Sequence, residues 1–323
     1  MRNAFAAKLL DIACADSSIL LITGDLGFGV FDNFQKELPE QFINAGVAEQ
    51  SMMSMAAGLA ASGYRPFVYS IANFPTFRCL EQIRNDVCYM DNPVTIVSVG
   101  AGLVYGVHGY SHHAVEDLAI MRSLPNMKIY SPCDSVETIY SVNKILEAKN
   151  PAYLRLGKGG EPLIHPDLHA EIQGMNLINS NGEDGLICWT GSIGSKVIQA
   201  ADLLKERGLR PKLVSIPILN SQSIEQMLLL SHNQLILTVE EHSPAGGLGS
   251  LVLEVAAESN FEGKVIRLGI PQSTNKEIGS HEYLLEISGL SAIAISERFE
   301  SESLNLQRKS PVGSISSPPS QRH

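Results

Sequence analysis

The sequence predicts an α/β protein with two parallel-sheet domains. Three observations favour this class: short apolar runs alternate with helical patterns, the alternation stops once and then restarts, and the last residues turn polar. Short buried strands separated by helices are typical of a parallel sheet covered on both faces. A chain of 323 residues has room for two domains of ordinary size.

The first domain is predicted over residues 1–160. Its strands are expected where apolar runs are bounded by Gly, Pro or polar residues, and its helices where apolar residues recur with helical spacing. The predicted strands are 19–23, 42–44, 65–69, 94–99, 127–130 and 153–156. The predicted helices are 5–15, 50–62, 79–89, 115–123 and 135–148.

Residues 161–184 are rich in Gly, Pro, His and charge, and are predicted as a linker. The alternation then restarts, which predicts a smaller α/β domain over residues 185–300. Its strands are expected at 186–189, 212–216, 234–239 and 264–268, and its helices at 194–207, 224–230 and 248–259. Residues 301–323 are dominated by Ser, Pro, Gln and Arg, which predicts a disordered tail.

Composition excludes several classes of protein. The formal net charge is −10, and an acidic surface repels phosphate backbones, so nucleic-acid binding is not expected. Five scattered cysteines without paired spacing fit a reducing cytoplasm better than a disulfide framework. The uncharged stretches 50–64 and 92–107 are shorter than the roughly 20 residues of a membrane helix, so no membrane span is expected.

A glutamate stands where a strand passes through a glycine turn into a helix of small residues. The segment reads Asn-Ala-Gly-Val-Ala-Glu-Gln and places Glu49 at the start of that helix. A carboxylate there can simply complement the positive end of the helix dipole. The alternative is a partly buried acid that exchanges a proton with a ligand nitrogen. Taken alone, the segment leaves both interpretations open.

Three histidines fall within six residues of a glycine-rich loop after the strand 94–99: His108, His112 and His113. Ligands of open α/β sheets bind beyond the carboxyl ends of the strands, and imidazole transfers protons near neutral pH. The loop is therefore a candidate substrate site. A purely structural polar loop is one alternative. A metal site is less favoured, because no carboxylate or cysteine stands at ligand spacing.

Two further segments carry weaker signals. Phe74 follows the strand 65–69 and can either stack on a flat ligand or belong to the core. The glycine-rich stretch 239–249 joins a strand to a helix, where backbone N–H groups can hold an anion. Tight packing is the more common reason for such glycines.

Taken in order, these segments resemble the transketolase family. Residues 44–50 are similar to its NxGxAEQ segment, residues 106–127 to its histidine-containing stretch that ends in P-N-M, and residues 239–249 to its V-E-E-H…GGLG. Ser-Pro-Cys-Asp at 131–134 fits the P-x-D that follows. The resemblance covers about residues 2–299. It is strongest to the C-terminal halves that occur as separate chains in split transketolases, and weaker to deoxyxylulose-phosphate synthases.

The resemblance implies a pyrimidine-binding domain, a transketolase C-terminal-like domain and thiamine diphosphate as the cofactor. Glu49 matches the catalytic glutamate, which hydrogen-bonds a pyrimidine ring nitrogen and favours the imino tautomer. Phe74 matches the aromatic residue that stacks on the pyrimidine. His112 matches the histidine that contacts substrate oxygens, and Asp25 falls where the family often has an acid near the cofactor. The implied reaction moves a two-carbon ketol unit from a ketose to an aldehyde.

Some positions depart from the family. His108 and His113 stand where an acidic residue and a glutamine are usual, and both are candidate substrate-binding residues. Arg2 and Lys158 fall near positions that bind a sugar phosphate, although lysine lacks the planar fork of arginine. A modified or unphosphorylated sugar donor therefore stays open.

The chain lacks the GDG motif with which the family holds the metal ion of the diphosphate. We therefore expect no metal site here. We expect a separate N-terminal, diphosphate-binding subunit that holds Mg²⁺ or Ca²⁺, and an α2β2 heterotetramer. Two alternatives remain: the β subunit of a 2-oxo-acid dehydrogenase-like decarboxylating component, and a non-catalytic assembly subunit. Glu49 and His112 argue against the second. The histidine pair at 112–113 and the Glu-Glu-His run at 240–242 argue against the first.

Overall fold

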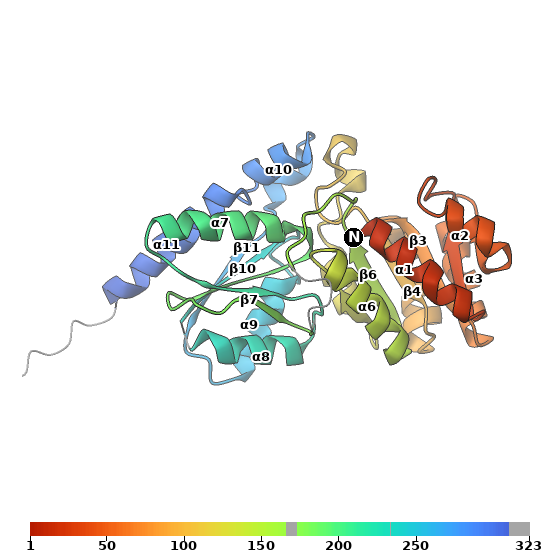
Figure 1. Cartoon of the computed structure of the whole chain (residues 1–323), viewed down its shortest axis with the longest axis horizontal. Coiled ribbons are helices and arrows are strands. Elements are labelled where there is room, and N and C mark those ends of the chain that lie inside the picture. Colours follow the sequence, from red (N-terminus) through yellow and green to blue (C-terminus); the bar gives the residue numbers. More distant parts are fainter. Residues whose placement is uncertain (166–172, 233, 310–323) are drawn as a thin grey trace, which may run out of the picture.

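The computed structural model describes residues 1–165, 173–232 and 234–309, and it has two α/β domains side by side (Figure 1). The first domain holds a six-stranded sheet and the second a five-stranded sheet. This confirms the predicted fold class. Among the described residues, no helix is both long enough and apolar enough to cross a membrane.

All strand pairs of the first sheet are parallel, in the order β2-β1-β3-β4-β6-β5. The strands are β1 (Ile19–Thr23), β2 (Phe42–Asn44), β3 (Arg65–Ile71), β4 (Thr95–Val99), β5 (Lys128–Tyr130) and β6 (Ala152–Leu156). The helices are α1 (Arg2–Ala15), α2 (Asp32–Glu37), α3 (Glu49–Ala61), α4 (Leu80–Gln82), α5 (Asp117–Arg122) and α6 (Ser135–Ala148), and a π-helical turn spans Ile83–Tyr89.

Helices cover both faces of this sheet because alternate strand residues point to opposite sides. Ile19 and Leu21 of β1 share a core with α1 and α6, whereas Ile22 shares a core with α3 and the π-helical turn. The strands β1 and β4 are buried along their whole length. Their carboxyl ends therefore form a rigid edge on which loops can hold functional side chains.

The second sheet has the order β11-β10-β8-β9-β7. Its strands are β7 (Asn176–Asn179), β8 (Leu186–Thr190), β9 (Lys212–Ser215), β10 (Leu235–Glu240) and β11 (Lys264–Leu268). Its helices are α7 (Gly194–Glu206), α8 (Ser221–Ser231), α9 (Leu248–Glu258), α10 (His281–Ile287) and α11 (Ala292–Lys309). The domains also contact each other: Arg122 of α5 donates from Nη1 to the Gly247 carbonyl before α9, at 3.1 Å.

Two expectations about the polar segments were wrong in part. The predicted linker contains β7, a short edge strand that pairs antiparallel with β9. The predicted disordered tail begins inside α11, which continues to Lys309. Phe299 is fully buried and Leu306 packs on the same core as α7, so packing holds this Ser-rich stretch in a helix. Residues 310–323 lie outside the described residues.

Candidate functional site

Loops at the carboxyl ends of neighbouring strands of the first sheet carry most of the predicted site residues. The strands β2, β1, β3, β4 and β6 are adjacent and parallel, so their carboxyl ends meet at one edge. The residues that these loops place there are Asp25 after β1, Glu49 after β2, Phe74 after β3, His108 and His112 after β4, and Lys158 after β6.

Glu49 is the first residue of α3 and is only 6% exposed. Its Oε1 accepts a hydrogen bond from Nη1 of Arg78 at 3.0 Å. The guanidinium of Arg78 also lies over the Phe74 ring, with Cζ 4.0 Å from the ring centroid. Sequence reasoning missed Arg78, although a lone cation four residues after the candidate stacking aromatic was a usable signal. The predicted acid and the predicted aromatic are thus joined through one cation.

The line of contacts continues into the histidine loop. The Phe74 and His112 rings meet edge to face, with centroids 5.2 Å apart, and His112 lies 4.9 Å from His108. Burial, together with the nearby His108 and Arg78, lowers the pKa of His112. His112 is therefore a neutral imidazole at pH 7, which can both donate and accept hydrogen bonds.

Asn44 fixes the loops after β1 and β2 to each other. Its Oδ1 accepts from the backbone N of Asp25 at 3.1 Å and of Gly46 at 2.9 Å, while its Nδ2 donates to Asp25 Oδ1 at 3.0 Å. Asp25 has a φ of 60°, a left-handed conformation that aspartate tolerates better than most residues. Asp25 is exposed at the same edge of the sheet as Glu49.

Arg2 and Lys158 converge on Tyr105. Lys158 Nζ lies 5.9 Å from the Tyr105 ring centroid, and that ring lies 6.2 Å from the ring of His108. Burial raises the pKa of Tyr105, while the charge of Arg2 opposes this shift. A line of contacts therefore runs from Glu49 through Arg78, Phe74, His112 and His108. The two cations lie at the far end of this contact line, next to Tyr105.

A cavity of about 280 Å³ opens next to Lys158, between the two domains. Its lining includes Ser192, Glu241 and His281 of the second domain. Glu241 is buried and accepts a hydrogen bond from His281 Nε2 at 2.8 Å. The second domain therefore supplies polar walls next to the cationic end of the site.

His113 does not join the other two histidines. It is 1% exposed, and neither ring nitrogen has a hydrogen-bond partner among the described residues. Burial lowers its pKa, and its carbonyl accepts from Asn73 Nδ2 at 2.6 Å. Contact with a substrate would require this loop to move, so we leave His113 out of the proposed substrate contacts.

In the glycine-rich stretch 239–249, a side chain of the protein itself binds the backbone N–H groups at the start of α9. Glu240 accepts from the backbone N of Leu248 at 2.7 Å and of Gly249 at 2.9 Å. A Cβ on Gly247 would lie 2.0 Å from Glu240 Oε2, so this glycine is required by close packing. An external anion would have to displace a buried carboxylate, and the packing explanation of these glycines therefore holds.

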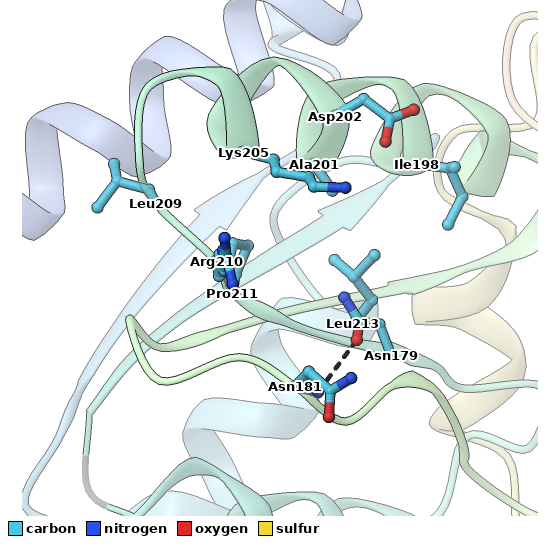
Figure 2. A pocket seen from close by; sticks show the side chains of 10 residues that line it. All are labelled: Asn179, Asn181, Ile198, Ala201, Asp202, Lys205, Leu209, Arg210, Pro211 and Leu213. Atoms are coloured by element: carbon cyan, nitrogen blue, oxygen red, sulfur yellow. Dashed lines mark hydrogen bonds between the residues drawn. The ribbon is translucent and has the colours of Figure 1, made fainter.

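Another cavity, of about 480 Å³, lies in the second domain between α7 and the edge formed by β7 and β9 (Figure 2). Its polar lining includes Asp202, Lys205 and Arg210, and Asn181 N donates to Asn179 Oδ1 at 3.0 Å. None of the predicted site residues lines it. The chemistry is therefore assigned to the edge of the first sheet.

Two known domain families match the chain, one for each of its domains. Residues 1–160 match the family described as transketolase, pyrimidine binding domain, and residues 174–295 match transketolase, C-terminal domain. A putative transketolase C-terminal section from Methanocaldococcus jannaschii is 35% identical over 306 residues, which cover 94% of this chain and 96% of that protein. The chain belongs to the transketolase family.

Relatives of two lengths occur within this family. One of the separate subunits of the apulose-4-phosphate transketolase from Phocaeicola vulgatus is 33% identical, over 91% of this chain and 96% of that protein. A 1-deoxy-D-xylulose-5-phosphate synthase from a Synechococcus strain is also 33% identical, over 96% of this chain but only 49% of that protein. The chain thus corresponds to a separate subunit in some transketolases and to half of a longer chain in other relatives.

Solved structures agree with this assignment. A structure described as a split gene transketolase, inactive beta4 tetramer, superposes with a TM-score of 0.82 at 32% identity, over 95% of this chain and 98% of that one. A transketolase from Pichia stipitis has a TM-score of 0.79 at 21% identity and is covered to 46%, which supports the fold alone. The resemblance to a split transketolase C-terminal chain is therefore confirmed.

Proposed function

We propose that this chain is the pyrimidine-binding subunit of a thiamine-diphosphate-dependent enzyme that transfers a two-carbon ketol unit from a ketose to an aldehyde. The observation that carries the proposal is Glu49, a buried carboxylate at the head of α3, joined through Arg78 to the Phe74 ring. A buried acid beside an aromatic ring fits a flat heterocycle with a ring nitrogen. The residues present therefore fit the aminopyrimidine of this coenzyme.

In this proposal, each side chain along the contact line has a separate role. Thiamine diphosphate, when bound, supplies the nucleophilic carbon that carries the ketol unit. Glu49 holds a proton at a pyrimidine nitrogen, and Phe74 fixes the plane of the ring. Because Arg78 occupies Oε1 of Glu49, the other carboxylate oxygen is free for the coenzyme. His112, kept neutral by its surroundings, donates and accepts hydrogen bonds at substrate oxygens.

The cationic end of the line supports a phosphorylated sugar. Arg2 and Lys158 both lie near Tyr105, whose ring neighbours that of His108. Two positive charges suit a phosphate group, with lysine acting as a point charge. Two of the relatives are named for the sugar phosphates apulose 4-phosphate and 1-deoxy-D-xylulose 5-phosphate, which supports the same class of substrate here.

A second subunit completes the site in this proposal. It holds the diphosphate through Mg²⁺ or Ca²⁺, and two copies of each chain form an α2β2 heterotetramer. Large apolar side chains are exposed on α3, on the loops before it and after β1, and at the end of the π-helical turn, as expected for a surface that a partner covers: Phe28, Val47, Met55, Tyr89 and Met90. The related split transketolase is described as an inactive beta4 tetramer, which supports this requirement. The free cysteines support a cytoplasmic location.

The test is a donor screen on the reconstituted pair. The chain is co-expressed with a candidate partner that contains GDG and a downstream asparagine, and turnover is measured with ketose phosphates, free ketoses and pyruvate. We expect ketol transfer from ketose phosphates by the pair and none by either chain alone. Decarboxylation of pyruvate without ketol transfer would instead assign the chain to the 2-oxo-acid dehydrogenase class.

A further inference from the structure

A buried cluster at the junction of the two domains takes no part in the proposed chemistry. It consists of Cys133, before α6, Glu137 in the first turn of α6, and His165 in the linker. The thiol sulfur, a carboxylate oxygen and an imidazole nitrogen all lie within 4.8 Å of one another. We propose that these three residues bind one transition-metal ion of the zinc type, which fastens the linker to both domains.

The orientation of His165 points its free nitrogen into the cluster. Its Nδ1 donates to Asp134 Oδ2 at 2.9 Å, because an ionised carboxylate can only accept. Its Nε2 has no hydrogen-bond partner in the described part of the chain, and its side chain is only 6% exposed. A carboxylate that orients a histidine through the remote nitrogen is the usual support of a metal-binding imidazole.

The contact between His165 and Glu137 has the composition and spacing of a pair of metal ligands. Nε2 lies 3.6 Å from Glu137 Oε1, which is too long for a hydrogen bond. Either a proton on Nε2 or a metal ion satisfies this contact. In the metal-bound chain the ion would take the place of that proton, and both atoms would act as ligands.

The donor set selects the kind of metal. A thiolate and an imidazole favour zinc-like ions over Mg²⁺ or Ca²⁺, which prefer oxygen. On binding, the Cys133 thiol releases its proton, and one thiolate and one carboxylate together offset a divalent charge. The Ser215 hydroxyl of β9 lies beside Cys133 and Glu137 and would be near enough to supply a further ligand.

The second domain also reaches the cluster. Asn176 of β7 donates to Glu137 Oε1 at 3.0 Å, and Glu137 Oε2 accepts from the backbone N of Cys133 at 2.7 Å. Asp134 accepts from the backbone of Ile164 and His165 at 2.9 Å each. The ion would therefore join α6, the linker and the β7–β9 edge at a single point, independently of coenzyme and partner.

The test uses the metal-free full chain and two probes, Co²⁺ and Zn²⁺ alone. We expect one ion per chain by equilibrium dialysis, a thiolate-to-cobalt charge-transfer band, and a rise of Tm with Zn²⁺. Cys133→Ser should remove the band and the Tm rise. His165→Gln should weaken Co²⁺ binding at least about tenfold, the smaller end of the usual loss when a metal site is damaged.

Two controls keep the outcome decisive. Cys88→Ser removes a buried thiol of the first domain outside the cluster, and Cys14→Ser removes an exposed thiol. Both should bind Co²⁺ like the wild type, and if Cys133→Ser does not fold, the loss of Co²⁺ affinity in His165→Gln decides the matter. The proposal is overturned if the wild type binds no stoichiometric Co²⁺, or if Cys133→Ser retains the thiolate band.

Discussion

Arg78 Nη1 donates to Glu49 Oε1 at 3.0 Å, and the two residues are 29 positions apart in the chain. One partner is buried and the other is half exposed, so the pair spans the boundary between core and solvent. The contact ties the start of α3 to the loop after β3. It also leaves one oxygen of Glu49 for a ligand.

The Glu49–Arg78 pair should contribute modestly to stability. Because Arg78 is half exposed, solvent screens the interaction, and we expect a coupling of about 0.5–1 kcal/mol in a double-mutant cycle of Glu49→Gln and Arg78→Met. Urea unfolding at low and high salt measures it. The coupling should shrink at high salt. Coupling that is absent at low salt would mean that the two side chains are not paired in solution.

His108 should set both the charge state of His112 and the donor preference. The rings lie 4.9 Å apart, and the charge of His108 contributes to the low pKa of His112. We expect His108→Gln to raise the pKa of His112 and His108→Asp to raise it further, as followed by NMR titration of the histidine signals.

In the reconstituted pair, His108→Asp should shift kcat/KM toward ordinary ketose phosphates. Unchanged ratios across donors would contradict a role in donor choice.

Glu240 should make stability fall as pH rises. Burial raises the pKa of Glu240 to about 7, although the N–H groups of Gly249 and Leu248 oppose the shift. The folded state therefore binds this proton more tightly than the unfolded state. The resulting stabilisation is complete below the ordinary pKa and is lost as pH rises through 7.

Glu240→Gln removes this titration. We expect the free energy of unfolding of the variant, minus that of the wild type, to grow by at most about 3 kcal/mol between pH 4.5 and 8. His242, whose pKa burial lowers to about 4, contributes the opposite slope and is neutral in the folded state over most of this range. Urea unfolding across this pH range gives the comparison, and parallel pH profiles would refute the assignment.

The ion pair between Asp117 and Arg155 should be the most sensitive polar contact of the domain junction. Arg155 Nε lies 2.7 Å from Asp117 Oδ2, both side chains are buried, and Arg155 also donates to the Glu241 carbonyl at 2.9 Å. Asp117→Asn leaves the buried arginine without its hydrogen-bonded carboxylate, and we expect a loss of about 3–5 kcal/mol by urea unfolding. Glu147→Gln, which breaks the exposed pair with Lys144, should cost less than about 1 kcal/mol.

The sheets were predictable from sequence because apolar runs and helical periodicity are local properties. The edge strand β7 was not, because it is only four residues long, two of them asparagine, and pairs only with β9, about 35 residues later in the chain. The helix α11 was missed because packing of Phe299 and Leu306 outweighs a Ser-rich composition. Local pattern therefore identifies the interior strands and misses elements that depend on tertiary contacts.

The site residues that belong to short sequence motifs were predictable. Those that are defined by contacts between distant parts of the chain were not. Glu49, Phe74 and His112 each stand in a short motif after a strand, so position in the sheet indicated them. Arg78 and the cluster around His165 depend on contacts between distant segments, such as the 31 positions that separate His165 from Asp134. No spacing rule connects such residues before the fold is known.

The measurement that tests the central claim most directly is kcat of the reconstituted pair with Glu49→Gln at saturating thiamine diphosphate, with Glu206→Gln, an exposed glutamate of α7, as the matched control. If Glu49 holds the proton at the pyrimidine, kcat falls by at least about 10²–10⁴-fold while the coenzyme remains bound, and the control keeps wild-type turnover. Full turnover by Glu49→Gln would contradict the account.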